Sequence, residues 1–88
     1  MQGKRVYPND EGFLILEAGE YGKDPTDGEW YMRPPPKEGF FSGKGRLSAH
    51  TVIEHEDGTI TVSPSILVYG HHGRQWHGYL ERGVWREV

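Results

Sequence analysis

Alternation of apolar and polar side chains is the strongest pattern in this chain, and it is concentrated in the last third. Residues 50–55 and 59–63 alternate with a period of two on either side of Asp57 and Gly58, a dipeptide typical of hairpin turns. Further β-forming runs follow at 66–69, 75–81 and 84–86. Short strands joined by turns in this way predict an antiparallel meander.

The first half of the chain has weaker strand signals. An apolar run at 13–16 predicts a buried strand, and residues 30–32 predict another, whereas 1–12 and 20–29 are rich in turn-forming residues and predict loops. Thirteen Gly and six Pro leave no helical period longer than about two turns. We therefore expect a mainly β fold, a small antiparallel meander or partly rolled sheet with little or no helix, in a single domain over 1–88.

The composition limits both the core and the class of protein. Apolar residues make up 34% of the chain, so the core must depend on the three Trp, five Tyr and three Phe, because each aromatic side chain buries about 150–250 Å². Trp30, Tyr31, Phe40 and Phe41 could instead form a binding surface, but in a chain this poor in aliphatic residues we expect them to be core.

Charge and hydropathy exclude two kinds of partner. The net charge is −3 with no run of Lys or Arg, so we expect no nucleic acid. No apolar stretch approaches about 18 residues, so we expect no membrane. The N-terminus has no apolar segment of the kind that directs export, and there is no Cys. These features predict a soluble, cytoplasmic protein without disulfides.

Ser65 and the histidines around it are the candidate chemistry. A two-residue turn at Asp57 and Gly58 would place His50 opposite Ser65, whereas a three-residue turn with a bulge would place it opposite Pro64. The dipeptide favours the first alternative. Pro64 also predicts a bulge beside Ser65, because proline cannot donate to a β ladder.

The following strand brings a second histidine towards Ser65. If Tyr69 pairs with Gly73, His77 lies directly opposite Ser65, and a slip of two residues still keeps both on one face. Polar neighbours on each strand place both side chains on the more polar face of the sheet. A serine beside a histidine is a candidate nucleophile and base, with backbone N–H groups near Ser65 or Gly78 to hold an oxyanion. A strand-surface serine and half-buried sheet histidines are the alternative interpretation.

Two further groups of residues have the composition of a site. His50, His71, His72 and His77 could converge at one end of the meander and hold Zn, although no His-x-His or His-x-x-x-His spacing is present. Acidic residues gather at the predicted hairpin tip, and we expect them to be solvated; they are Glu54, Glu56 and Asp57.

The last 40% of the chain resembles an uncharacterised family of small domains frequent in actinobacterial phages. The resemblance rests on 54–66, with its Pro64-Ser65-Ile66 step, and on 76–81 and 83–85, with their Trp76-His77-Gly78-Tyr79-Leu80 step. Related, longer domains from bacterial operons of ubiquitin-like conjugation look like serine peptidases, and they carry a Cys-rich segment that this chain lacks. The resemblance implies a small phage-type accessory protein in the bacterial cytoplasm, with Ser65 and His77 in the peptidase positions.

Two functions follow as competing hypotheses. The first is a minimal Ser-His hydrolase in which Ser65 attacks an acyl carbon and His77 or His50 takes its proton. The second is a non-enzymatic module that binds a host or phage protein, for which several exposed aromatic residues and an isolated Ser65 are expected. The partner is a protein in one case and a peptide substrate in the other. A His-bound metal protein is a third possibility.

Overall fold

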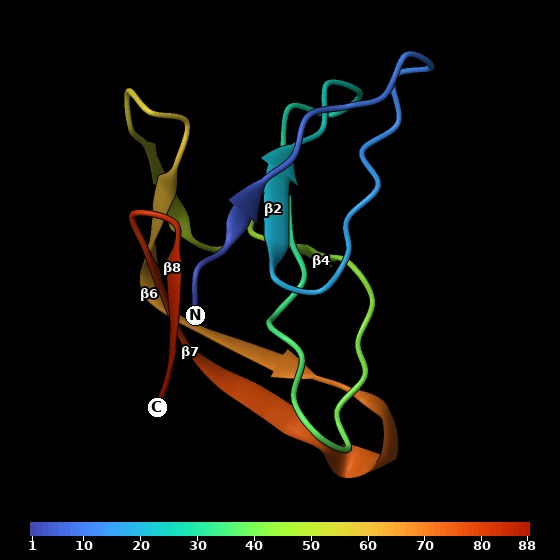
Figure 1. Ribbon diagram of the computed structural model, residues 1–88, viewed down its shortest axis with the longest axis vertical. Helices are drawn as coiled ribbons and strands as arrows, with labels where there is room; N and C mark the ends of the chain where they lie inside the picture. The colour runs from blue at the N-terminus through green and yellow to red at the C-terminus, as the bar shows by residue number, and fades with distance from the viewer.

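The computed structural model describes all of residues 1–88 and has two four-stranded sheets (Figure 1). The first sheet has the order β1-β2-β3-β4, with strands Lys4–Arg5, Glu20–Lys23, Trp30–Met32 and Gly45–Arg46. The second has the order β5-β6-β7-β8, with strands Thr51–Glu54, Ile60–Tyr69, Gln75–Glu81 and Val84–Glu87. The single helical element is the 3-10 turn η1 at His71–Gly73, and no helix has the length and apolar character needed to cross a membrane.

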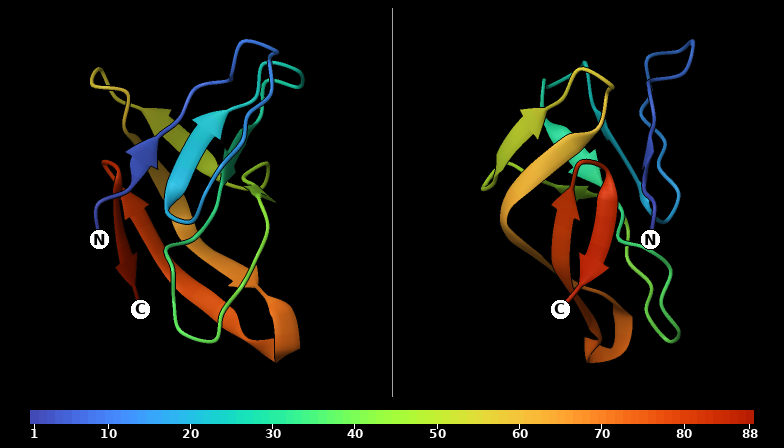
Figure 2. Two further views of the ribbon diagram at one scale, coloured as in Figure 1. Left: turned by 45° about the vertical axis from the view of Figure 1, so that its right-hand side comes forward. Right: turned by 60° about the vertical axis from the view of Figure 1, so that its left-hand side comes forward.

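The second sheet is the predicted antiparallel meander. Each strand pairs antiparallel with the next one along the chain, and β6 runs without a break through Pro64, where two separate strands were expected. The hairpin of β6 and β7 extends to the η1 turn, where the loop before β4 lies beside it and the Phe41 carbonyl accepts the His71 N–H (Figures 1 and 2). The expectation of a mainly β fold is therefore confirmed.

The first sheet differs from the sequence-based expectation. The run at 13–16 is not a strand: Leu14 and Leu16 are buried and Phe13 and Ile15 are exposed, so it is an extended segment anchored by alternate side chains without a ladder. Strands β1 and β2 instead lie in the two regions predicted as loops, and they pair in parallel. Gly22 permits this pairing, because a side chain there would collide with the Val6 carbonyl.

A single core lies between the two sheets. Its buried members are Tyr21, Met32, Phe40 and Leu47 from the first half, with Ile60, Val62, Ile66, Trp76, Leu80 and Trp85 from the second. The Trp76 and Trp85 rings meet edge to face, with centroids 5.3 Å apart, a favourable geometry for aromatic pairs. Of the four aromatic residues considered above, Phe40 is in the core, Trp30 packs against it and Tyr31 is half-buried, while Phe41 is exposed.

The first residues of the chain connect the sheets. Gly3 N–H donates to the Gly83 carbonyl at 2.7 Å, and the Met1 carbonyl accepts from Trp85 N–H at 2.8 Å, so this segment runs beside β8. The Trp85 indole N–H donates to the Gly19 carbonyl at 2.9 Å. The sheets therefore meet along their edges around the shared core, in a partly rolled arrangement (Figure 2).

Candidate functional site

The hairpin of β5 and β6 has a three-residue turn, so the two-residue prediction is wrong. His55 N–H donates to the Thr59 carbonyl at 2.8 Å, and Gly58 adopts a left-handed conformation with φ of +87° that accommodates the extra residue. Both the Thr59 N–H and its hydroxyl donate to Asp57 Oδ1, which fixes this turn. With Thr51 opposite Ser63, the register brings His50 towards Pro64, as the alternative turn predicts.

The hairpin of β6 and β7 is shifted by two residues from direct opposition of Ser65 and His77. Tyr69 pairs with Gln75, because the connection through η1 is longer than the one assumed, and Leu67 is the residue opposite His77. The register changes between Val62 and Ile66, which is the irregularity expected around Pro64. A shift of two preserves the face, so Ser65 and His77 become diagonal neighbours on the outer side of the sheet.

Ser65 and His77 are in hydrogen-bond contact. The distance from Ser65 Oγ to His77 Nε2 is 2.9 Å, and both residues are half-buried. With the imidazole neutral and protonated on Nδ1, the serine hydroxyl donates to Nε2, which is the arrangement of a nucleophile and its base. No carboxylate forms an ion pair with His77, so the two residues form a dyad without a third member.

His50 also contacts Ser65, but at the backbone. Its Nε2 lies 3.2 Å from the Ser65 carbonyl oxygen and must donate to it, while its Nδ1 is buried without a partner. A nitrogen that carries its proton towards a carbonyl cannot accept the hydroxyl proton. Of the two histidines proposed as bases, only His77 reaches the Ser65 hydroxyl.

Gly78 has a packing role in the strand beside the dyad. A side chain at this position would collide with the Trp76 ring and with the Arg86 carbonyl, so only a glycine leaves room here for both the indole and β8. Its pairing with Ile66 and Glu87 places it inside the sheet between β6 and β8. A role for its N–H at an oxyanion stays a prediction.

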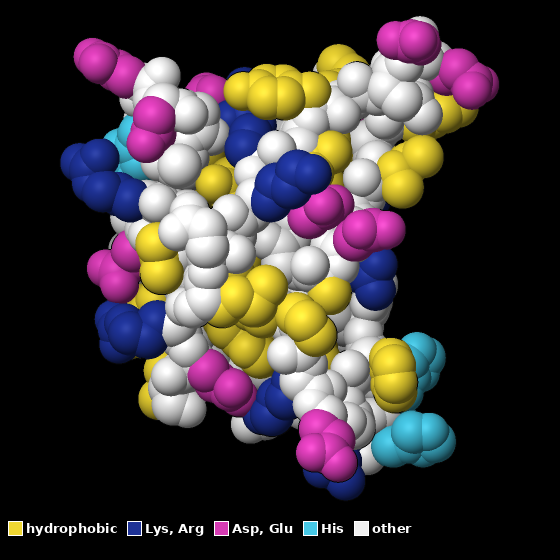
Figure 3. Space-filling view, viewed as in Figure 1, with side chains coloured by type: hydrophobic (Ala, Val, Ile, Leu, Met, Phe, Trp, Pro, Cys, Tyr) yellow, Lys and Arg dark blue, Asp and Glu magenta, His cyan; other side chains and the backbone are white.

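The four histidines considered for a metal do not converge. His50 and His77 flank Ser65, whereas His71 and His72 lie on the η1 turn, where histidine side chains project at the lower right of Figure 3. No group of three or more His, Asp or Glu side chains has an arrangement that could hold a metal ion.

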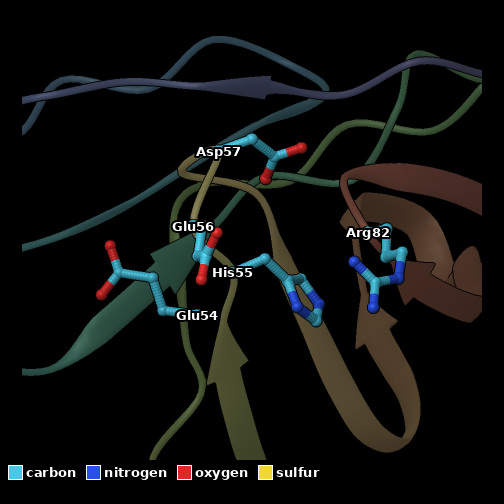
Figure 4. Close-up of a pocket in the computed structure, with 5 residues that line it drawn as sticks. All are labelled: Glu54, His55, Glu56, Asp57 and Arg82. Carbon is cyan, nitrogen blue, oxygen red and sulfur yellow. The ribbon is translucent and has the colours of Figure 1, made fainter.

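The largest hollow in the surface lies at the β5–β6 hairpin tip, away from the dyad. It measures about 490 Å³ and is lined by Glu54, His55, Glu56, Asp57 and Arg82 (Figure 4). The acidic residues were noted in the sequence, but Arg82 comes from the β7–β8 turn and no local pattern connects it to them. The Thr61 hydroxyl oxygen connects the two turns, since it lies 2.7 Å from His55 Nε2 and accepts the Arg82 N–H at 3.0 Å.

Hydrogen bonding lowers the pKa of one carboxyl group at this tip. The side-chain and backbone bonds from Thr59 hold the pKa of Asp57 below its ordinary value.

A second, smaller hollow of about 220 Å³ is lined by Met1, Pro35, Pro36, Trp76, Trp85 and Glu87. Neither hollow includes Ser65 or His77, so the dyad lies on an open sheet surface.

Comparison of the chain with protein-family models, curated proteins and solved structures finds no match in any of the three. The function must therefore be inferred from the geometry of the site.

Proposed function

We propose that this protein is a minimal Ser-His hydrolase that cleaves acyl groups of peptides or esters, with Ser65 as nucleophile and His77 as base. The observation that carries the proposal is the 2.9 Å contact between Ser65 Oγ and His77 Nε2. The resemblance to peptidase-like domains points to the same two residues, and through it we also propose a phage-type accessory role.

The reaction needs only these two side chains and water. Ser65 Oγ forms a bond to the acyl carbon while its proton passes to His77 Nε2, and the imidazolium then protonates the leaving amine or alkoxide as its bond to the acyl carbon breaks. Water, deprotonated by the same nitrogen, attacks the acyl-serine and releases the carboxylic acid. The proton returns from His77 to Ser65 Oγ, so the dyad is regenerated.

The surroundings of the dyad predict a slow enzyme. General-base catalysis contributes about 10²–10⁴-fold, and here no carboxylate supports the imidazolium and no hollow excludes water. Activated esters, whose leaving groups need little protonation, are therefore the most sensitive substrates for a first assay.

The test compares four proteins with p-nitrophenyl acetate and with a fluorophosphonate probe that labels nucleophilic serines. We expect wild type to hydrolyse the ester and to be labelled, and Ser65→Ala and His77→Gln each to lose at least tenfold in rate. His72→Asn is the matched control, because His72 is exposed on the η1 turn and Asn tolerates its φ of +60°. A wild-type rate equal to that of Ser65→Ala would rule out the hydrolase.

A protein-binding module is the second candidate. Two large side chains of the outer face are exposed beside the dyad, Leu67 at 46% and Tyr69 at 71%. Contiguous apolar patches mark protein-binding surfaces, and these two side chains are neighbours on one face of β6. Equal ester hydrolysis by wild type, Ser65→Ala and His77→Gln would favour this function over the first.

A further inference from the structure

One edge of β6 has no neighbouring strand along half of its length. The pairing of β5 with β6 ends at Thr51 and Ser63, but β6 continues to Tyr69. Beyond Ser63, every ladder partner of β6 belongs to β7 on the other side. The stretch from Ser65 to Tyr69 is therefore a strand edge (Figure 2).

The backbone bonds of β7 show which groups point out from this edge. The His77 carbonyl accepts Val88 N–H at 2.9 Å and so faces β8, which makes Leu67 and His77 a pair without mutual hydrogen bonds. By alternation the same holds for Tyr69 and Gln75. The N–H and C=O groups of Leu67 and Tyr69 therefore point away from β7, and none of the backbone bonds outside the strand ladders involves them.

Both ends of this open stretch are closed by contacts of the protein itself. At one end the His50 imidazole donates to the outward Ser65 carbonyl, and at the other the Phe41 carbonyl accepts His71 N–H at 3.1 Å. Four backbone groups over residues 67–69 remain unpaired between these closures. Two donors and two acceptors on alternate residues match the backbone of one short extended segment.

We propose that this edge binds an extended peptide as an added strand, and that such peptides are the substrates of the dyad. The second part rests on the proposed function. His50 blocks the edge at Ser65, so a bound strand must leave the sheet next to the serine. The exposed Leu67 and Tyr69 side chains face the same side as Ser65 and favour a peptide with an apolar residue on that side.

The experiment is an NMR titration of Ser65→Ala, which prevents turnover, with an acetylated, amidated peptide of alternating Val and Thr. N-methylation along one edge of the peptide stops it from pairing with itself and leaves one edge free. The same peptide methylated along both edges is the control, because it keeps its apolar surface but has no donors. We expect the Leu67 and Tyr69 amides to exchange with solvent at least tenfold more slowly with the first peptide and unchanged with the second.

A pair of protein variants gives a second measurement. Leu67→Pro removes an outward N–H without removing a bond to β7, and proline is tolerated at strand edges. Leu67→Ala removes the side chain and keeps the N–H. We expect Leu67→Pro to lose binding at least tenfold and Leu67→Ala to lose no more than a few-fold. If Leu67→Pro does not fold, the two peptides alone decide.

Several results would overturn the proposal. Equal binding of both peptides would show an apolar patch rather than a strand edge, and shifts away from residues 65–71 would place the site elsewhere. A dimer of the protein that is absent in Leu67→Pro would assign the edge to a second copy of the chain. Binding of the first peptide without ester hydrolysis by wild type would refute the hydrolase and leave the strand-binding edge, whereas hydrolysis without binding would do the reverse.

Discussion

The two faces of the β6–β7 hairpin are built from the same strands and differ in almost every physical property. The inner face carries Ile66, Trp76 and Leu80, each no more than 1% exposed, in the middle of the core. The outer face carries Ser65 and His77 in contact with each other, beside exposed apolar side chains. Because successive residues of a strand point to opposite faces, tight packing on one face fixes the positions of side chains on the other. The dyad thus has a rigid support without being enclosed.

The hairpin tip of β5 and β6 differs from the dyad: it has a hollow but no Ser-His pair. There, two turns curve towards each other and form a polar hollow, but no serine or threonine is among the residues that line it. On the hairpin strands, diagonal neighbours meet across a regular sheet, which brings side chains together but makes no concavity. Contact between groups and enclosure of a ligand therefore come from different features of this fold.

The largest expected effect is on the inner face. Trp76→Ala removes a side chain that is 1% exposed and in edge-to-face contact with the Trp85 ring. We expect a loss of about 3–5 kcal/mol in the free energy of unfolding. Tyr79→Ala, on the outer face of the same strand, is the matched variant. It loses a cation–π contact with Arg86 and should cost about 1 kcal/mol. Urea denaturation of both measures the difference, and similar losses would contradict the distinction between the faces.

An intermediate effect is expected where the ladder of β5 ends. His50→Ala removes the donor to the Ser65 carbonyl, and we expect a loss of about 1 kcal/mol in the free energy of unfolding. In His50→Gln the side-chain amide can occupy the position of Nε2 and donate the same bond, so this variant should retain most of the stability. Equal losses in the two variants would show that His50 acts through packing rather than through this hydrogen bond.

The contrast between regions also explains what the sequence could predict. In the second sheet, alternation and turn residues act between neighbouring strands, so the strands, the irregularity at Pro64 and the shared face of Ser65 and His77 were all predictable. The register was not, because it depends on one extra residue at Gly58 and two at η1, and several turn lengths fit the same dipeptides. Ser65 and His77 are nevertheless in contact, because a shift of two residues keeps both side chains on the same face of the sheet.

The first sheet was poorly predicted for a different reason. Strands β1 and β2 are short and pair in parallel, and β1 is also held by the N-terminal segment that runs beside β8. Such contacts connect residues that are far apart in sequence and leave no local periodicity. The run at 13–16 shows the converse, since its alternation reflects burial of Leu14 and Leu16 without any strand partner. Likewise, no local pattern connects Arg82 to the hollow at the hairpin tip.

The smallest expected effect concerns the charge at that tip. The pKa of Asp57 lies below its ordinary value of 3.8, because Thr59 donates two hydrogen bonds to the carboxylate. The folded protein thus binds this proton less readily than the unfolded chain does. The resulting stability is present above the ordinary pKa and is lost as the pH falls through the folded value.

Asp57→Asn lacks this contribution, so its melting temperature should be slightly below that of wild type at pH 7, and the gap should close below pH 3.8. Glu56→Gln removes a neighbouring charge from a residue whose side chain makes no hydrogen bond in the turn, so we expect its acid stability to stay close to that of wild type. If both variants behave alike, net charge rather than the Thr59 hydrogen bonds controls the acid stability of the tip.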